Sequence, residues 1–493
     1  MDIFLHGIET SERDAGNPRF VATIDSAITF IVGTAPEANA TLFPINQPQV
    51  VRGYNDMPVG LGDTGTLPLQ LDKMLGQSGR ASPTIYFVRV EEDEGEDDAV
   101  TLANVLGSRA AKTGLHALSR IQGEFGDRPK LIGAPGFTST RPTDGVASIA
   151  VGTAGTGYDL NEPPVVTIAR AVGDTTGFGA EGVAIVSAEG AITAVVVTNP
   201  GQSYSETPVV TVAAPATGTQ AVATATLGTV ANPIASALSQ LCNRYRACSM
   251  ISGPNTTDAA AVLYRGDFDT DRMMLLDPYV KVSQGASIVS MPADGMGLAL
   301  QARIDYEEGF WYSPSNHVLE AVLGTHRPIE HSLNDRSAQS QYLNKNHVST
   351  IVRSPTGGWK FWGNRVMTAD PLRLHWSVRR GHDVIVESVE IASEPYVDKP
   401  FSRQILVDIA ETVNRALRRW EALGATLGGR VWLDPAINTA ESLAAGILYI
   451  DYDGETPAPM EHIVFRFNRN TGYYDTMLAA AAREIARLSS VAA

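Results

Sequence analysis

The stretch Ala27-Ile28-Thr29-Phe30-Ile31-Val32-Gly33-Thr34-Ala35 is apolar and rich in β-branched side chains, so it predicts a short buried strand. Thr84–Val90 has the same character, and a helical stretch, Leu67–Leu75, lies between the two runs. Further along, Val100–Leu106 predicts a second helix, and Lys130–Pro135 predicts a strand that ends in a turn. Strands that alternate with helices favour an α/β domain with a largely parallel sheet.

A change of composition interrupts this pattern near Pro142. From there to about Val230 the chain is rich in Gly, Ala, Thr and Val, and Arg170 is its one basic residue. The segment holds a weak internal repeat, in which Gly155–Tyr158 followed by Pro164–Ile168 resembles Gly201–Tyr204 followed by Pro208–Val212. Two β-rich repeats predict a small all-β domain, residues 142–231, inserted in a surface loop.

Mixed α/β character resumes after this segment, so we expect the domain that begins at 23–141 to continue over 232–345. Ile234–Cys248 predicts a helix, and Arg272–Pro278 predicts a buried strand that proline stops. Ala286–Ile304 is first broken by glycines and then helical.

The next section, 346–458, contains one clear amphipathic helix at Ser402–Glu421. Ser402 is a natural N-cap and Gly424 a natural stop. The apolar stripe of this helix consists of Ile405, Leu406, Ile409, Val413, Ala416, Leu417 and Trp420.

Residues near the C-terminus predict a strand pair and a helix. The two strands are expected at Leu448–Tyr452 and His462–Phe467, and an Ala-rich helix is expected at Met477–Leu488.

Three cations, Arg415, Arg418 and Arg419, fall opposite the apolar stripe of the amphipathic helix at 100° per residue. One interpretation is a solvated face whose cations favour the C-terminal end of the helix. The other is a docking face for an acidic partner, which a basic patch on an acidic protein would bind selectively.

Composition excludes several classes of protein. The 493 residues carry a formal net charge of -16, which argues against nucleic-acid binding because that function needs a basic surface. Two cysteines, Cys242 and Cys248, fit neither a disulfide framework nor a zinc pattern. No window resembles a signal peptide or a membrane span, so we expect no membrane insertion and synthesis in the cytoplasm.

Motifs for catalysis, cofactors or metals are weak. Gly60-Leu61-Gly62-Asp63-Thr64-Gly65 matches the spacing of a dinucleotide loop, but a turn rather than a strand precedes it. Asp267–Asp271 resembles the opening of a calcium loop, but Arg272 replaces the required glycine and Pro278 the bidentate glutamate. The acidic run Glu91–Asp98 is typical of a solvated turn. We therefore expect no catalytic residue, no cofactor and no metal.

Several short segments resemble contractile bacteriophage tail sheath proteins, a family with a subtilisin-like domain that is related to the sheaths of R-type bacteriocins and type VI secretion systems. The most specific is Gly358-Trp359-Lys360-Phe361-Trp362-Gly363-Asn364-Arg365 followed by Asp370-Pro371, which resembles the signature Gly-x-x-x-Trp-Gly-Asn-Arg. The others, in chain order, are His6–Thr10, Ser26–Ala35, Phe43–Pro48, Val88–Glu91, Leu131–Gly136, Ala302–Asp305 with Glu308–Trp311 and Ser315-Asn316, Asp398–Pro400, and Gly446–Tyr452. The resemblance skips roughly 142–231.

This resemblance implies an α/β multidomain fold: a non-catalytic subtilisin-like α/β domain, an α+β C-terminal sheath domain with strand-exchanging arms, and the inserted all-β domain. It implies a structural subunit that polymerises as stacked, hexameric rings around a tail tube protein and contracts to drive the tube through the host envelope. Baseplate and tail terminator proteins are the further partners implied. The location implied is the virion tail, after assembly in the host cytoplasm.

Two arms are implied to link the copies of the chain, residues 1–22 and residues 459–493. Such arms add strands to the sheets of neighbouring subunits, where main-chain hydrogen bonds form the joint. The candidate contact residues are Ile3, Phe4, Ile8, Ile463, Phe465 and Phe467. In related sheaths a basic helix contacts the tube, so the resemblance makes Arg415, Arg418 and Arg419 the tube-contact candidates.

Alternatives from other classes remain open at this point. The particle could be a phage-like bacteriocin or another contractile injection particle. A subtilisin-like hydrolase would need a convergent Asp, His and Ser, and no motif supplies one. A glycan-binding surface protein would rest on the repeats within 142–231.

Overall fold

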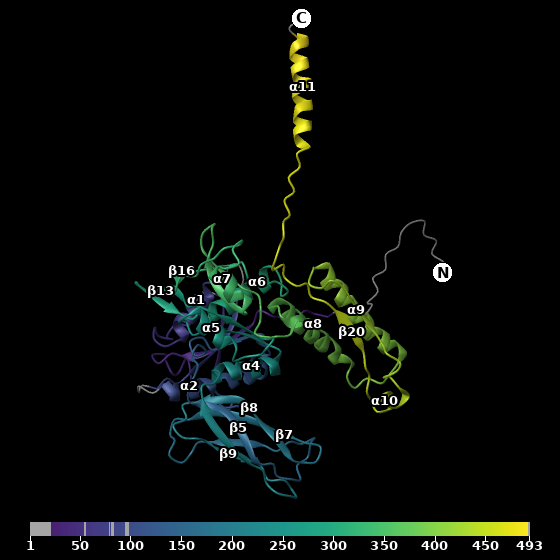
Figure 1. Cartoon of the computed structure of the whole chain (residues 1–493). Coiled ribbons are helices and arrows are strands. Elements are labelled where there is room, and N and C mark those ends of the chain that lie inside the picture. The colour runs from purple at the N-terminus through teal and green to yellow at the C-terminus, as the bar shows by residue number, and fades with distance from the viewer. Residues whose placement is uncertain (1–20, 54–55, 78, 80–82, 94–97, 492–493) are drawn as a thin grey trace, which may run out of the picture. The chain divides into compact units, whose positions relative to one another are not determined.

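The computed structural model describes residues 21–491 except 54–55, 78, 80–82 and 94–97, and side chains up to residue 488 (Figure 1). The chain divides into two units, Met1–Ala458 and Pro459–Ala493.

A nine-stranded sheet forms the centre of the first unit, and its inner strands are parallel. In sheet order these strands are β15 (Val318–Leu319), β18 (Trp359–Trp362), β17 (Val348–Arg353), β12 (Met273–Leu276), β11 (Cys248–Ser252), β4 (Leu131–Gly133), β1 (Thr29–Thr34), β3 (Thr84–Val90) and β2 (Pro48–Arg52). The six from β17 to β3 pair in parallel, while β2, β18 and β15 add antiparallel edges. The predicted mixed α/β character is therefore confirmed.

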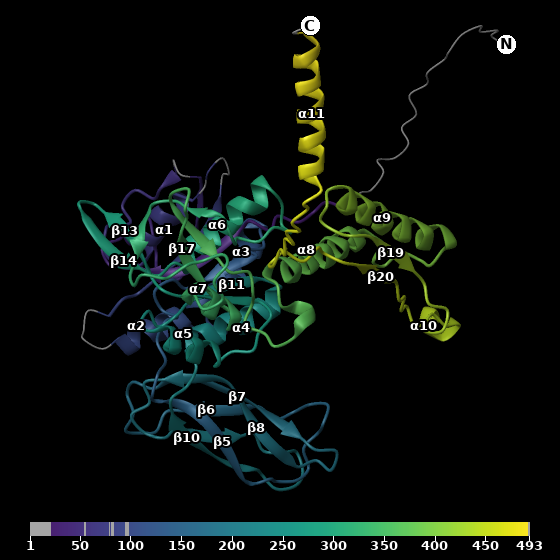
Figure 2. The same ribbon diagram turned by 45° about the horizontal axis from the view of Figure 1, so that its top comes forward.

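Helices surround this sheet (Figures 1 and 2). They are α1 (Leu67–Leu75), α2 (Asp98–Leu106), α3 (Leu118–Phe125), α4 (Pro233–Tyr245), α5 (Asp258–Arg265), α6 (Asp294–Glu307) and α7 (Gln339–Lys345). Among them α6 is buried on nearly all sides, because Leu298 and Leu300 contribute to one core cluster and Ala299 to another. A small sheet of β13 (Val280–Gln284), β14 (Ser287–Met291) and β16 (Val322–Thr325) lies outside the large one.

Two predicted element boundaries were wrong. The helix predicted over 234–248 ends at Tyr245, because Arg246 takes a left-handed conformation (φ 47°) and Cys248 already belongs to β11. The stretch 286–304 begins with strand β14, which forms a hairpin with β13 through Gly285 (φ 56°) before α6 starts at Asp294.

The large sheet also extends past the predicted boundary between 345 and 346. Strand β17 pairs in parallel with β12, and β18 pairs with β17. Both strands therefore continue the central sheet rather than begin the next section of the chain.

Only strands occur between residues 145 and 228, in two sheets (Figure 2). One sheet has the order β5 (Gly145–Thr153), β10 (Val222–Gly228), β9 (Val209–Val212) and β6 (Val166–Ala169), and β7 (Phe178–Val186) pairs with β8 (Ile192–Gln202). The two copies of the repeat meet: β6 and β9 are antiparallel neighbours. Both repeat tyrosines are buried, and the hydroxyls of Tyr158 and Tyr204 accept hydrogen bonds from backbone N–H groups at 2.8 and 3.2 Å.

The last section of the first unit contains α8 (Trp376–Ser393), α9 (Arg403–Ala422), β19 (Gly429–Trp432), α10 (Ala440–Ala444) and β20 (Asp451–Gly454). Helix α9 is the predicted amphipathic helix, and the Ser402 hydroxyl caps it by accepting from the Ile405 N–H at 3.2 Å. Its stripe packs against Val384 and Val389 of α8.

The predicted strand pair near the C-terminus was wrong. Strand β20 starts at Asp451 and pairs with β19, whereas residues 462–467 have no regular secondary structure. The reason is that β19 and β20 cross the apolar face of α9, where both Gly429 and Gly454 lie against Leu417.

The second unit, Pro459–Ala493, consists of an extended segment and helix α11 (Tyr473–Val491). The predicted helix, 477–488, is present and starts four residues earlier. Among the described residues no helix combines the length and apolarity needed to cross a membrane.

Candidate interaction surfaces

The carboxyl edge of the parallel sheet is where an open α/β fold would place a ligand. Asp294 lies there in full burial at the start of α6, and Thr138 donates to it at 3.4 Å. Burial raises the pKa of Asp294 to about 7. The neighbouring Asp277 is also buried, but Arg327 and the Asn255 N–H already bind its carboxylate. These contacts hold loops together. None of these hydrogen bonds between described residues joins a nucleophile to a base.

Arginines occupy the acidic loop that resembles a calcium site. Arg141 binds both oxygens of Asp267 at 2.6 and 2.7 Å, and Arg379 approaches Asp271 at 3.3 Å. The described part of the chain has no group of three or more His, Cys, Asp or Glu arranged to hold a metal ion. Burial raises the pKa of both Cys242 and Cys248, so these thiols resist ionisation in the core.

The amino edge of the same sheet carries a different feature, a cluster of ion pairs with α8. Lys130 precedes β4, Arg246 precedes β11 and Arg272 precedes β12, so three neighbouring parallel strands each present a cation at one edge. On α8, Glu387 binds Lys130, Glu390 binds Arg246, and Asp383 binds Arg272, with one bond of the last pair at 3.0 Å.

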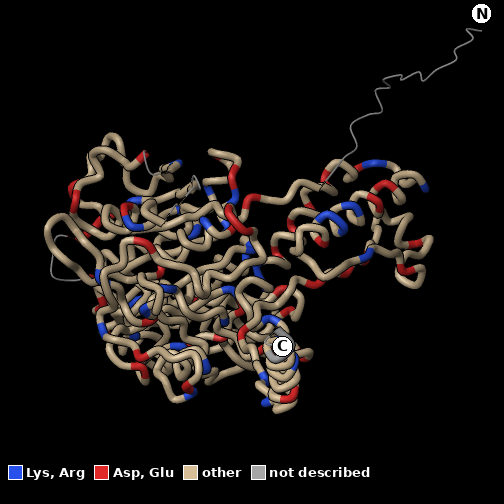
Figure 3. The backbone as a smooth tube through the Cα atoms, turned by 90° about the horizontal axis from the view of Figure 1, so that it is seen from above, with Lys and Arg blue, Asp and Glu red and all other residues tan. Residues whose placement is uncertain are grey.

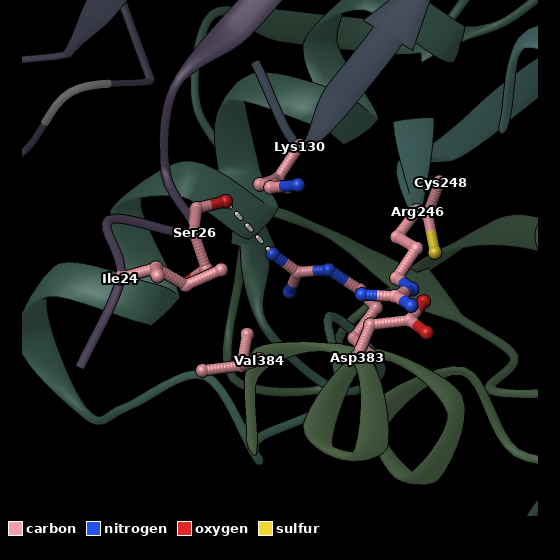
Figure 4. A pocket seen from close by; sticks show the side chains of 8 residues that line it. Ile24, Ser26, Lys130, Arg246, Cys248, Asp383 and Val384 are labelled. Atoms are coloured by element: carbon pink, nitrogen blue, oxygen red, sulfur yellow. Dashed lines mark hydrogen bonds between the residues drawn. The ribbon is translucent and has the colours of Figure 1, made fainter. Parts of the chain in front are cut away.

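The deepest member of this cluster is the pair between Arg380 of α8 and Asp305 of α6. Each side chain is 2% exposed, and one guanidinium–carboxylate contact measures 2.8 Å. Arg380 also donates to the Ser26 carbonyl at 3.0 Å (Figure 4). The Ser26 hydroxyl donates to Asp305 at 2.7 Å. The indole N–H of Trp376 reaches Gln301 on α6 at 3.0 Å. Helix α8 is thus fixed to the sheet by paired charges, and we call these contacts the α8 clamp.

The three arginines predicted to face away from the apolar stripe do so. Arg415, Arg418 and Arg419 are all exposed on α9, while Leu417 and Trp420 beside them are buried. Figure 3 marks Lys and Arg along this helix in blue. Three cations within five residues make a positive face on an acidic chain.

Strands β19 and β20 form a two-stranded sheet of their own. In the part of the chain that the structure describes, neither strand has a second β-partner, so each has one edge without ladder hydrogen bonds. Each strand has four residues. Such edges are templates for pairing with another strand.

The extended segment before α11 has the alternation of a strand but no partner in the described chain. Ile463, Phe465 and Phe467 are 58%, 91% and 93% exposed. In an extended conformation these three side chains share one face. The other arm candidates, Ile3, Phe4 and Ile8, lie outside the described residues.

Sequence reasoning missed helix α8 and with it the α8 clamp. The only signal is the helical spacing of Val378, Ile385 and Val389, which are buried. Arg380 and Asp383 are buried on the same helix, so a search for an apolar stripe passes over it.

Comparison with known proteins gives a consistent result. Residues 213–367 match the family model described as the phage tail sheath protein central domain, and residues 368–470 match the phage tail sheath C-terminal domain. Together these matches cover more than half of the chain. The tail sheath protein of Burkholderia phage BcepMu is 28% identical over 96% of this chain and 98% of its own length. The tail sheath protein of Escherichia phage P2 is 24% identical over 94% and 96%.

Solved structures of the same fold are also similar. The helical sheath of the anti-feeding prophage in its contracted state superposes with a TM-score of 0.58 at 16% identity, covering 95% of this chain and 100% of that chain. The sheath complex of the extracellular contractile injection system PVC, also contracted, gives a TM-score of 0.56 at 13% identity over 96% and 99%.

Proposed function

The chain belongs to the phage tail sheath family and is a structural subunit of a contractile sheath, and from this premise we propose how its copies join and what they enclose. Its phage relatives are tail sheath proteins, and the solved structures of the same fold belong to sheath assemblies, which supports an oligomeric component of a virion tail. The copies stack as hexameric rings around a tail tube protein, between a baseplate and a tail terminator. Contraction drives the tube through the host envelope. Assembly takes place in the host cytoplasm without catalysis.

The open edges of the β19–β20 sheet carry this proposal. A sheet of two short strands is marginal on its own, and an apolar alternating segment elsewhere in the same chain has no strand partner among the residues that the structure describes. Residues 461–468 of one copy therefore add a strand to β19–β20 of another, and residues 1–22 of a third copy add a strand at the other edge. Main-chain hydrogen bonds give a joint that survives rotation of the globular parts of the subunits. The side chains of Ile463, Phe465 and Phe467 fix the register of the added strand.

The large sheet and its helices act as the subtilisin-like body of the subunit. It comprises 23–141 and continues from 232, and we place its end near residue 367 rather than 345, because β17 and β18 belong to its sheet. Residues 368–458 form the C-terminal sheath domain, and 142–231 form the inserted all-β domain on the outer surface. The α8 clamp joins body and C-terminal domain, so the two move together.

The insertion should be dispensable for folding and assembly. The Val230 N–H donates to the Pro142 carbonyl at 2.9 Å, so the two ends of the segment meet. We expect a chain in which a short Gly-Ser linker replaces 143–229 to remain folded and to form cylinders of normal length in negative-stain images. Because β8 packs against α4, with Asn199 donating to the Pro233 carbonyl at 3.0 Å, a modest fall in melting temperature is expected. Loss of cylinders from a folded variant would place the insertion in the lattice instead.

The basic face of α9 should bind the tube. We expect Arg415→Glu, Arg418→Glu and Arg419→Glu together to leave sheath polymerisation intact and to weaken low-salt binding of purified tubes about tenfold or more, because three attractive charges become repulsive. Co-sedimentation with tubes measures this.

A matched control uses three exposed cations elsewhere, Lys281→Glu, Lys345→Glu and Arg353→Glu, with the same change of net charge. Tube binding should survive in the control. If both triple variants lose tube binding equally, net charge rather than the α9 face is responsible.

A second candidate is a sheath of a phage-like bacteriocin or other injection particle, which the fold shared with the anti-feeding prophage and PVC sheaths favours. Microscopy of the particles that the producing cell releases separates the two, because DNA-filled heads on the tails identify a phage and headless tails an injection particle.

A further inference from the structure

Two segments of the first unit contact helix α8, one near each end of that unit. The N-terminal crossing, residues 21–26, precedes β1, and the C-terminal crossing, residues 455–458, follows β20 and ends the unit. Ile24 of the first crossing packs against the core cluster that contains Val384 of α8, and Figure 4 shows both side chains. The two arms of the proposed function adjoin these crossings in the sequence.

The C-terminal crossing lies against Gly381, inside α8. Thr456 is 0% exposed, and a Cβ atom at Gly381 would lie 2.6 Å from the Thr456 Oγ1 and 2.7 Å from its Cγ2. Atoms that are not bonded do not pack so closely, so any larger residue at 381 would have to displace Thr456. A glycine inside a helix is destabilising relative to alanine. The close crossing is therefore the feature that requires glycine at this position.

The N-terminal crossing is held by both long helices of the C-terminal domain. The Ile24 N–H donates to the Ser388 hydroxyl of α8 at 3.1 Å. The indole N–H of Trp420 on α9 donates to the Thr23 hydroxyl at 3.0 Å. Val21, the first described residue, is buried in the core cluster that α8 and α9 share. The chain is thus fixed to these helices before it enters the central sheet.

The two contact points lie on one face of α8. Gly381 and Ser388 are seven residues apart, which is close to two full turns of an α-helix, so they point to the same side. Along the helix axis they are separated by about 10 Å. Because the α8 clamp holds this helix on the sheet, both crossings have fixed positions relative to the body and to each other.

We propose that Gly381 and Ser388 are positioning residues for sheath assembly, which set the distance between the points where the two arms leave the subunit. Only residues 457–460 separate Thr456 from the strand that is donated, and so short a tether leaves little freedom in where that strand begins. The spacing on α8 thereby determines which neighbouring copies the arms reach. This inference rests on the proposed function, because it assumes that strands are exchanged.

Substitution Gly381→Ala in the full-length chain tests the C-terminal contact. The added methyl group displaces Thr456, so the protein concentration for half-maximal polymerisation should rise about tenfold or more, as light scattering and negative-stain microscopy measure. Adding Thr456→Gly removes the side-chain atoms that the new Cβ would meet, so polymerisation should recover. Gly123→Ala is the matched control, because Gly123 is also helical and a Cβ there would meet nothing within 4 Å.

A labelled peptide of residues 459–472 separates positioning from simple support of the β19–β20 sheet. It is added to full-length chains below the concentration at which cylinders form, and its binding is followed by fluorescence anisotropy. The unaltered and Gly381→Ala chains should bind it with equal affinity, because binding needs the sheet edge but not the crossing.

Three outcomes would overturn the positioning role. They are normal polymerisation of Gly381→Ala, no recovery with Thr456→Gly, and loss of peptide binding together with polymerisation, which would show that Gly381 only supports the sheet. An unaltered chain that does not bind the peptide would instead reject the proposed strand donation.

The N-terminal contact has its own test. Ser388→Ala removes the acceptor of the Ile24 N–H, so polymerisation should require several-fold more protein while peptide binding stays unchanged. Ser393→Ala is the matched control in the same helix, since its hydroxyl donates to the Val389 carbonyl of α8 at 2.7 Å. Equal effects of the two substitutions would contradict a positioning contact at Ser388.

Discussion

A chain shortened to residues 1–458 is expected to fold and to remain unpolymerised at concentrations where the full chain forms cylinders. The removed unit contains none of the described core clusters, so the body should keep its melting temperature. It does contain the segment with Ile463, Phe465 and Phe467, which we propose as the donated strand. Without it each copy offers the β19–β20 edge but has no strand to place on it.

Sedimentation velocity and negative-stain microscopy measure this loss, and circular dichroism reports whether the body is folded. A chain shortened to residues 1–472 is the matched control, because it keeps the strand and loses α11. It should still assemble into cylinders. Normal cylinders from the 1–458 chain would contradict strand donation by the C-terminal unit.

Substitution Arg380→Met should lower the apparent free energy of unfolding by about 3–5 kcal/mol, because it leaves the buried Asp305 carboxylate without its counter-charge. The two side chains are each 2% exposed, so water cannot replace the guanidinium without opening the joint between α6 and α8. Urea unfolding followed by tryptophan fluorescence measures this, since Arg380 lies 5.8 Å from the ring centre of Trp376.

Two controls accompany this variant. Arg418→Met removes an exposed cation of α9 and should change stability by about 0.5 kcal/mol at most. The double change Arg380→Met and Asp305→Leu removes both charges and should recover much of the loss, because no unpaired charge stays buried. If Arg380→Met were no more destabilising than Arg418→Met, the α8 clamp would not hold the two parts of the subunit together.

The sequence was sufficient to predict those helices and strands that a pattern of neighbouring residues specifies. The apolar runs at 27–35 and 84–90 are buried strands β1 and β3, because burial on both faces of a parallel strand requires continuous hydrophobicity. Helix α9 could be predicted from its apolar stripe and from the N-cap residue Ser402. The exposed position of Arg415 followed from the same helical geometry.

Features that depend on distant partners could not be predicted. Helix α8 buries Asp383 and Glu387 because Arg272 and Lys130 pair with them, and it buries Arg380 because Asp305 of α6 pairs with it. No local pattern in the sequence indicates these distant partners. The pairing of β20 with β19 depends on how both cross α9. Residues 462–467 have the residue pattern of a strand, yet they have no strand partner in the described part of their own chain, as expected of a segment donated to another copy.

The most direct test of this account is a cryo-EM reconstruction of the assembled polymer at a resolution that traces the backbone of the β19–β20 sheet. The account predicts a sheet enlarged by residues 461–468 of a second copy on one edge and by the N-terminal arm of a third copy on the other. A sheet that keeps only its own two strands within an intact cylinder would contradict it.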